Sequence, residues 1–132
     1  MYNKVLVTGG SGFVGKRLKL VKPNWIYMSS KDCDLTDKNQ LKEYLGHTKP
    51  DAVIHLAARV GGIKEASQNQ SEFFYLNSMI NLNVIHECFK AGVKRLLSCL
   101  STCVFPDTSD KYPMTESDLL KGEPTLTNYC YG

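Results

Sequence analysis

The 132-residue sequence lacks the features expected of membrane, secreted or nucleic-acid-binding proteins. No apolar run approaches the length of a membrane span, and the first residues lead into an apolar segment without the layout of a signal peptide. Lysine and arginine are spread along the chain, so the net charge of +3 does not indicate nucleic-acid binding. We therefore expect a cytoplasmic protein that contacts neither membranes nor nucleic acids.

Metal-site and disulfide patterns are also missing. The five cysteines are an odd number, and no pair has the spacing of a zinc finger. The three histidines are dispersed and fit no ligand spacing, so no metal site is expected. We expect free thiols in a reducing compartment, with Cys88 and Cys99 as small buried apolar residues.

What the sequence does have is a glycine-rich turn between an apolar run and a helical pattern. Thr8 and the following glycines fit T-G-x-x-G-x-x-G, and a register starting at Gly10 fits G-x-G-x-x-G. A turn of this kind presents backbone N–H groups and a helix N-terminus to an anion. Its context favours a dinucleotide pyrophosphate site over a flexible glycine-rich hairpin. The residues predicted to bind the cofactor here are Gly9, Gly10, Ser11, Gly12, Phe13, Val14 and Gly15.

The periodicity of the remaining chain predicts alternating strands and helices. Strands are expected at 4–8, 25–28, 52–57 and 93–100, and helices at 12–21, from Thr36 to a stop at Gly46, and at 71–91, a substantially buried helix that Gly92 ends. Residues 58–70 are expected to form a loop. This order predicts an α/β fold: one domain over residues 1–132, with a Rossmann-like doubly wound parallel sheet of strand order 3-2-1-4.

The end of the second expected strand indicates which dinucleotide is bound. An NAD site usually has an acid here, whereas this chain has Ser29, Ser30 and Lys31. Two hydroxyls and an ammonium group suit a 2′-phosphate and favour NADP. Asp32 leaves NAD open as an alternative, and a solvated loop is another.

Two further stretches are expected to flank the cofactor. Asp34 would accept a hydrogen bond from the exocyclic amine of adenine, and Leu35 would pack on the ring. Leu56, Ala57 and Ala58 place small residues where a strand must pass under a cofactor. Tight packing against a helix explains the two alanines equally well.

Residues beyond the fourth expected strand could carry chemistry, because ligands of open α/β sheets sit beyond the carboxyl ends of the strands. The first and fourth strands are expected to flank the switch point, which places Ser101, Thr102 and Cys103 near a substrate carbonyl. A hydroxyl could donate to that carbonyl, and Cys103 is either a proton-transfer group or a structural thiol. Tyr131 is a poor acid–base group unless a nearby cation lowers its pKa.

Taken together, five stretches resemble the GDP-L-fucose synthases, a branch of the extended short-chain dehydrogenase/reductase family. The stretches that carry the resemblance are 8–15, 29–37, 55–62, 98–106 and 112–116. The glycine motif is shared by the whole superfamily, whereas Ala57-Ala-Arg-Val-Gly-Gly62 and Ser101-Thr-Cys-Val-Phe-Pro106 are far more specific to this branch.

The resemblance implies an oxidoreductase and isomerase of GDP-fucose biosynthesis. Such enzymes use NADPH to convert GDP-4-keto-6-deoxy-D-mannose by epimerisation at C3 and C5 and reduction of the C4 ketone. By resemblance, Ser101 and Tyr131 would hydrogen-bond the C4 oxygen, with Tyr131 as the proton donor, and Cys103 would move a proton during epimerisation. The full-length enzymes are homodimers, and helix 71–91 is implied in the pairing.

Two departures limit what the resemblance implies. The lysine of the family's Y-x-x-x-K pattern would fall three residues beyond Gly132, and the epimerisation histidine and the substrate domain lie in sequence that this chain lacks. We therefore expect the cofactor-binding N-terminal part of such an enzyme, which binds NADPH weakly and does not turn over alone. A non-catalytic dinucleotide-binding short form and a related nucleotide-sugar epimerase or dehydratase using NAD are the alternatives.

Overall fold

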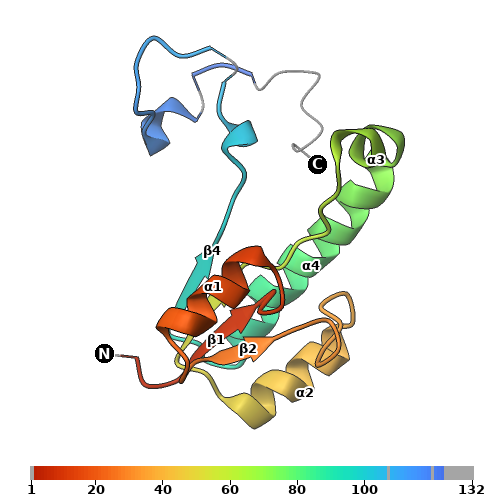
Figure 1. Ribbon diagram of the computed structural model, residues 1–132, viewed down its shortest axis with the longest axis vertical. Coiled ribbons are helices and arrows are strands. Elements are labelled where there is room, and N and C mark those ends of the chain that lie inside the picture. Colours follow the sequence, from red (N-terminus) through yellow and green to blue (C-terminus); the bar gives the residue numbers. More distant parts are fainter. Residues whose placement is uncertain (1, 107, 120, 124–132) are drawn as a thin grey trace. The chain divides into compact units, whose positions relative to one another are not determined.

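The computed structural model describes residues 2–106, 108–119 and 121–123, and Figure 1 shows its helices and strands. The elements are β1 (Val5–Thr8), α1 (Phe13–Val21), β2 (Ile26–Met28), α2 (Lys38–Thr48), β3 (Ala52–His55), α3 (Ile63–Gln68), α4 (Gln70–Lys90), β4 (Arg95–Ser98) and two 3₁₀ turns, Thr102–Val104 and Glu116–Asp118. The sequence predicts one domain, whereas the chain divides into two compact units. The first unit contains residues 1–59 and 75–99, and the second contains 60–74 and 100–132.

The four strands form a parallel sheet of order β2-β1-β3-β4, so the predicted order 3-2-1-4 is wrong. β3 pairs directly with β1 and lies on its other side from β2. Burial explains the difference, because β1 is buried along its whole length, as a central strand should be, whereas Ile26 and Tyr27 of β2 are half-buried at an edge. The α/β class, the doubly wound layout and the parallel pairing are confirmed.

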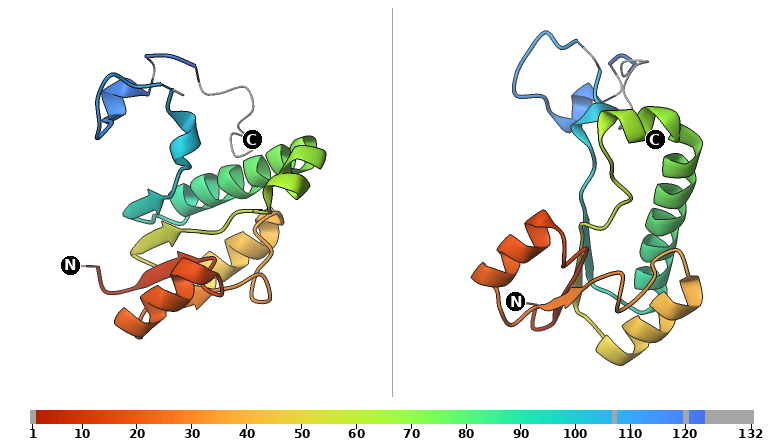
Figure 2. Two further views of the ribbon diagram at one scale, coloured as in Figure 1. Left: turned by 45° about the horizontal axis from the view of Figure 1, so that its top comes forward. Right: turned by 45° about the vertical axis from the view of Figure 1, so that its right-hand side comes forward.

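Helices cover both faces of this sheet. The right-hand view of Figure 2 shows α1 on one face and α2 and α4 on the other, as expected when successive right-handed crossovers run to opposite sides of β1. The main core lies under α2 and α4. Its buried members are Leu6, Met28, Cys33, Leu35, Leu41, Leu45, Val53, Val84 and Cys88.

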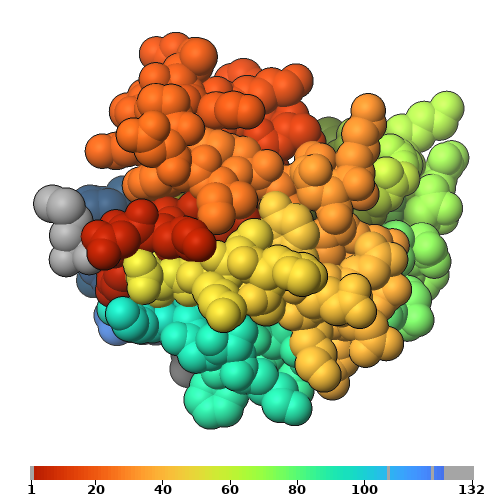
Figure 3. All heavy atoms as spheres, turned by 90° about the horizontal axis from the view of Figure 1, so that it is seen from below, coloured from red at the N-terminus to blue at the C-terminus, as the bar shows by residue number. Residues whose placement is uncertain are grey.

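A single carboxylate joins the amino ends of three strands. Asp51 Oδ2 accepts hydrogen bonds from the N–H groups of Asn3 and Lys4, each at 3.1 Å. Its Oδ1 lies 3.3 Å from Lys94 Nζ, and its carbonyl accepts from the Lys94 N–H at 3.0 Å. Figure 3 shows this end of the sheet, with the segments before β1, β3 and β4 side by side. These contacts fix where the strands begin relative to one another.

Both ends of α2 differ from the prediction. Asp37, and not Thr36, is the N-cap, because its carboxylate accepts from the N–H groups of Asn39 and Gln40. Gly46 does not stop the helix, which continues to Thr48 and is capped by Lys49 in the left-handed conformation with φ of 46°. An acid at the N-cap also interacts favourably with the helix dipole, which a threonine cannot do.

The long helix α4 ends as predicted but is less buried than expected. Gly92 has φ of +72°, and the N–H groups of Gly92 and Val93 return to the carbonyls of Phe89 and Cys88. This is a Schellman-type end. Of the positions predicted to be apolar and buried, Phe73, Val84 and Cys88 are buried, whereas Phe74, Ile85 and Phe89 are exposed.

The second unit contains two features that the sequence analysis did not predict. Residues 58–70, expected to be a loop, include the short helix α3. In the segment after β4, the buried Asp118 accepts from the Thr115 N–H and hydroxyl at 2.7 and 2.8 Å and pairs with Lys111 and Lys121. This network organises the turn around residues 115–118.

Within the described ranges, no helix is both long and apolar enough to cross a membrane.

Candidate functional site

The glycine turn between β1 and α1 is a compact structure in which three glycines leave no room for a side chain. Gly9 has φ of +68°, and a Cβ there would lie 2.9 Å from Ala57 N. A Cβ on Gly10 would meet Tyr27 Cβ at 2.7 Å, and one on Gly15 would meet Gly9 O at 2.6 Å. These contacts pack the turn against the ends of β2 and β3 and bring α1 close behind it.

Gly12 occupies a different environment. A Cβ at Gly12 would meet Gly9 O at 3.1 Å, and Gly12 is the residue that precedes the first turn of α1. Its N–H bonds to Gly9 O at 2.9 Å. Side chains at positions 11–14 are exposed, and Phe13 is 93% exposed. The helix N-terminus is therefore open to a ligand while the rest of the turn is closed.

Thr8 and His55, at the carboxyl ends of β1 and β3, form a buried pair. The Thr8 hydroxyl accepts from the N–H groups of Leu56 and Ala57, each at 3.2 Å, and lies 2.6 Å from His55 Nδ1. Because the oxygen already accepts twice, its proton is donated to Nδ1, which puts the histidine proton on Nε2. Burial lowers the pKa of His55, opposed by Asn81, so the ring is neutral at physiological pH.

This pair also corrects the expected position of the switch point. In the observed strand order, the crossovers after β1 and β3 leave in opposite directions, so β1 and β3 flank the switch point, and not β1 and the fourth strand. His55, one of the three histidines that fit no metal-ligand spacing in the sequence, holds the Thr8 hydroxyl there. Its place at the end of an apolar strand, opposite the threonine before the glycines, is the signal that could have identified it.

The end of β2 lies directly beside the glycine turn, because the Gly10 N–H donates to the Met28 carbonyl at 2.7 Å. Of the residues predicted to hold a 2′-phosphate, Ser29 is half-buried and Ser30 and Lys31 are exposed. Ser29 is already engaged, since its N–H and hydroxyl donate to Asp32 Oδ2 at 2.8 and 2.6 Å. These bonds lower the pKa of Asp32 and keep it ionised.

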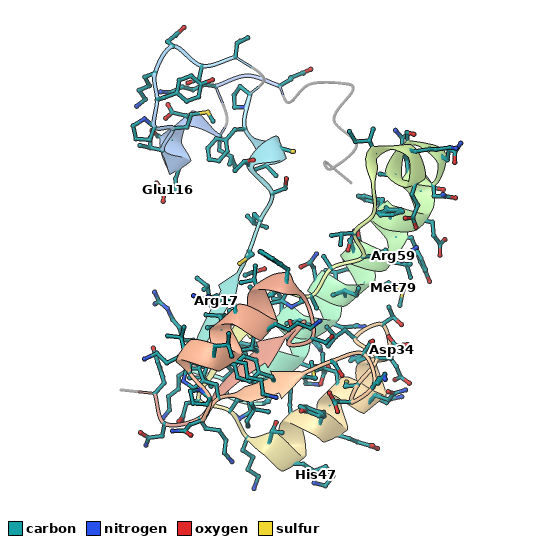
Figure 4. The ribbon with its side chains drawn as sticks, in the orientation of Figure 1. Arg17, Asp34, His47, Arg59, Met79 and Glu116 are labelled. Carbon is teal, nitrogen blue, oxygen red and sulfur yellow. The ribbon has the colours of Figure 1, made fainter. Side chains whose placement is uncertain are left out.

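The loop of residues 29–37 enters α2, and Figure 4 labels Asp34 on it, at the opposite end of that helix from His47. Asp34 is exposed, and its Oδ1 accepts from the Thr36 N–H and hydroxyl at 2.9 and 2.8 Å. The Leu35 side chain is buried in the core. Sequence reasoning missed Asn83, whose amide donates to the carbonyls of Leu35 and Thr36 at 2.9 and 3.0 Å.

An asparagine of α4 binds the backbone of the segment that follows β3. Leu56 and Ala57 are half-buried, Ala58 is exposed, and the next residue, Arg59, is clamped through its backbone. The Asn77 side chain accepts from the Arg59 N–H at 2.8 Å and donates to its carbonyl at 3.0 Å. Asn77 is therefore a bridge between α4 and the backbone of Arg59.

The predicted chemical groups belong to the second unit. The Ser101 hydroxyl caps the 3₁₀ turn Thr102–Val104 by accepting from the Cys103 N–H at 3.1 Å. Cys103 lies two residues further along the same turn and is half-buried. Tyr131 lies outside the described residues. The structure thus places Ser101 and Cys103 on one turn, with the serine hydroxyl oriented by the backbone of the cysteine.

Cys33, Cys88 and Cys99 are free thiols. Burial raises the pKa of Cys88 to about 11, with a further contribution from the charge of Glu87. Burial also raises the pKa of Cys33, assisted by Asp34, Asp37 and Asp32. Cys88 is buried as predicted, whereas Cys99 is exposed, contrary to the prediction, because β4 is an edge strand whose end is not covered within the first unit. Neither buried thiol suits chemistry.

Comparison with known proteins agrees with this geometry. The GDP-L-fucose synthase of Dictyostelium discoideum is 45% identical over 134 residues, which cover 96% of this chain and 42% of that protein. The probable GDP-L-fucose synthase of Drosophila melanogaster is 42% identical, with coverage of 97% and 42%. The crystal structure of a GDP-L-fucose synthetase from Naegleria fowleri bound to NADP superposes with a TM-score of 0.81 at 39% identity, covering 97% of this chain and 39% of that one.

The resemblance to GDP-L-fucose synthases seen in the sequence is confirmed, and the chain spans 42% of the length of the two curated relatives. The family model of the NAD dependent epimerase/dehydratase family matches residues 5–132. The match includes the glycine turn, the Thr8–His55 pair, the loop of residues 29–37 and the Ser101–Cys103 turn. The chain belongs to the NAD dependent epimerase/dehydratase family.

Proposed function

We propose that this chain is the cofactor-binding N-terminal part of an NADPH-dependent epimerase-reductase that converts GDP-4-keto-6-deoxy-D-mannose to GDP-L-fucose. The observation that carries the proposal is the glycine turn, closed by protein at Gly9, Gly10 and Gly15 and open at Gly12. Two further observations support the proposal: the Ser101–Cys103 turn, and the two relatives that are named as GDP-L-fucose synthases.

The residues of the turn fit a dinucleotide pyrophosphate. Gly12 is exposed at the N-cap of α1, which is where a phosphate would approach the N–H groups of the helix. The end of β2 offers Ser29, Ser30 and Lys31 to a 2′-phosphate, and the relative from Naegleria fowleri is bound to NADP. The exposed carboxylate of Asp34 would accept from the adenine amine. NADPH supplies the hydride when bound.

Ser101 and Cys103 are assigned complementary roles in the chemistry. The Ser101 hydroxyl accepts from a backbone N–H, which orients it and leaves its proton for donation to the C4 oxygen of the sugar. Cys103 would take or give the proton at the epimerised carbons, and Tyr131 would protonate the C4 oxygen during reduction. The fixed Ser101–Cys103 spacing supports the assignment, because both steps occur on one sugar ring.

Cofactor binding by the chain is tested by titration with NADPH, followed by the fluorescence of the reduced nicotinamide. We expect saturable binding that Gly12→Val abolishes, since the valine side chain would stand in front of the N-terminus of α1. Because its Cβ would also meet Gly9 O at 3.1 Å, circular dichroism must show that the variant is folded. Gly62→Val is the matched control, because nothing lies within 4 Å of a Cβ there. Equal NADPH binding by the two variants would contradict the assignment of the turn.

Catalysis is tested with GDP-4-keto-6-deoxy-D-mannose and NADPH. We expect no GDP-fucose from the 132-residue chain alone, and steady-state product formation by it would overturn that expectation. In a chain extended with the remaining part of a GDP-L-fucose synthase, Cys103→Ser should block exchange of the C3 and C5 protons with solvent. Ser101→Ala should slow reduction while leaving NADPH affinity unchanged. Normal exchange in the Cys103→Ser variant would remove Cys103 from the mechanism.

The exposed face of α4 supports a homodimer. Tyr75, Leu82, Ile85 and Phe89 are 58, 67, 52 and 83% exposed, and their spacing places them along one stripe of the helix. A second copy of the same stripe would bury this apolar surface. Sedimentation should show dissociation on Leu82→Lys, whereas Leu20→Lys on α1, where the leucine is 73% exposed, is the control and should leave the association state unchanged.

A further inference from the structure

An asparagine of α4 holds the turn that carries Asp34. The Asp37 N–H donates to the Asp34 carbonyl at 3.1 Å and closes this turn just before α2. The Asn83 side-chain amide donates to the carbonyls of the two central residues, Leu35 at 2.9 Å and Thr36 at 3.0 Å. A side-chain amide has two N–H groups, so Asn83 uses both of its donors on this one turn.

A single peptide group connects Asn83 to the Asp34 carboxylate. The Leu35 carbonyl and the Thr36 N–H belong to the same planar peptide unit. Its oxygen accepts from Asn83, and its N–H donates to Asp34 Oδ1 at 2.9 Å. The Thr36 hydroxyl donates to the same Oδ1 at 2.8 Å. Because the peptide is planar, the bond from Asn83 to its oxygen also sets the direction of the N–H that orients the carboxylate.

The position of Asn83 is itself fixed by packing. Asn83 is half-buried, and the neighbouring Val84 is buried in the core together with Cys88, one turn further along α4. The Leu35 side chain is buried in the same core. Loss of the Asn83 amide would therefore leave the turn attached to the core through Leu35, and would remove the bond that sets its peptide orientation.

We propose that Asn83 is a positioning residue for the adenine end of the dinucleotide, which acts by directing the Asp34 carboxylate toward the exocyclic amine. The proposal rests on the proposed dinucleotide function, in which the exposed Asp34 accepts from that amine. Oδ1 makes the bonds within the turn, so Oδ2 is the oxygen assigned to the amine. Without Asn83, the carbonyls of the turn bond to water, the peptide rotates and the carboxylate loses its orientation.

The test compares the dissociation constants of NADPH and of its hypoxanthine analogue, in which a carbonyl replaces the exocyclic amine. Binding is followed by the fluorescence of the reduced nicotinamide. A carbonyl cannot donate to Asp34, so the wild-type chain should bind NADPH about tenfold more tightly than the analogue. Asn83→Ala should reduce this ratio to about twofold, with the loss falling on NADPH. Asn83→Leu keeps the size of the side chain without its donors and should reduce the ratio in the same way.

Two further variants separate positioning from stability. Val84→Ala removes buried volume at the next position of α4 and should lower the free energy of unfolding in urea, while the binding ratio keeps its wild-type value. In an Asp34→Ala background, Asn83→Ala should change the ratio little, because the carboxylate that it positions is already absent.

The outcomes distinguish this proposal from the proposed function. A wild-type ratio in both Asn83 variants, with a reduced ratio in Asp34→Ala, would overturn the role of Asn83 and leave the proposed function standing. An equal reduction in Val84→Ala would also overturn it, because the ratio would then follow stability. Equal binding of the two dinucleotides by the wild type would remove Asp34 from adenine recognition, and the role of Asn83 with it. Binding of neither dinucleotide by the wild type would contradict the proposed function itself.

Discussion

The Thr8 hydroxyl holds three groups at once, since it lies 2.6 Å from His55 Nδ1 and 3.2 Å from each of the N–H groups of Leu56 and Ala57. Thr8→Val keeps the shape of the side chain but leaves these buried groups without a partner. We expect a loss of about 2 kcal/mol in the free energy of unfolding, measured with urea. Thr8→Ser keeps the hydroxyl and is the control; similar losses in the two variants would show that the methyl group, and not the hydroxyl, matters.

Two glycines with opposite environments give a matched pair of substitutions. Gly9→Ala should destabilise the chain by roughly 2 kcal/mol or more, because Gly9 has φ of +68° and a Cβ would lie 2.9 Å from Ala57 N. Gly46→Ala should stabilise it by about 0.5–1 kcal/mol, because Gly46 lies within α2 with nothing near a Cβ. Both are measured by thermal unfolding, and a destabilising Gly46→Ala would argue for the helix stop predicted from sequence.

The pKa of His55, which burial lowers, predicts a stability change near neutral pH. The unfolded chain takes up a proton on this residue near pH 6.5 and the folded chain does not, so stability is lost as the pH falls through that value. For one proton the slope cannot exceed about 1.4 kcal/mol per pH unit. His55→Asn should remove it between pH 7 and 5, whereas His47→Asn, at an exposed position, should not.

An unchanged slope in His55→Asn would assign the effect to other groups. Hydrogen bonds lower the pKa values of Asp32, Asp37 and Asp51. For Asp51 the largest contribution is the hydrogen bond from the Lys4 N–H. Their contribution is present above the usual carboxyl pKa near 4 and is lost below it, so it appears at lower pH than that of His55.

The N-cap of α2 is tested by three substitutions. Asp37→Ala should cost about 1 kcal/mol, because the N–H groups of Asn39 and Gln40 lose their acceptor. Asp37→Asn should recover most of this loss. Thr36→Ala should cost less than Asp37→Ala, and the reverse order in urea denaturation would support the cap expected from sequence.

The accessibility of the cysteines predicts an order of alkylation. With iodoacetamide, Cys99 should react in the native chain, whereas Cys33 and Cys88 should react only on unfolding, because both are buried and burial raises their pKa. Mass spectrometry of the digested chain gives the modified positions. Native modification of Cys88 at the rate of Cys99 would show that α4 does not stay packed on the sheet.

Local chemistry made the glycine turn predictable from sequence, and long-range pairing did not. Gly9 is required by its positive φ of +68° in the turn, and Gly15 by contacts with Gly9 and Gly10 in the same strand–turn–helix segment, so their spacing reveals them. The place of β3 beside β1 depends on which strand is buried on both sides, and the short β2 looks similar to a central strand in sequence. The assumed order of a common fold decided the prediction and was wrong.

The same division holds for the candidate site. Ser29 and Lys31 are recognisable as phosphate-binding types, but the bond from Ser29 to Asp32 is a matter of loop geometry. Asn83 could not be assigned, because its partners, the carbonyls of Leu35 and Thr36, are far away along the chain. Sequence identifies residues whose chemistry is local, and misses those that act by holding a distant backbone.

The Asp51 contacts mean that the amino ends and the carboxyl ends of the strands are held by different forces. At the amino ends of the strands, the half-buried carboxylate of Asp51 binds Asn3, Lys4 and Lys94, so salt screens part of the attraction and acid removes its charge. At the carboxyl ends, Thr8 makes a buried hydrogen bond between neutral groups, which salt does not screen. At high salt and low pH, hydrogen exchange should therefore show protection lost first at the amino ends of the strands, while the carboxyl ends near Thr8 keep theirs.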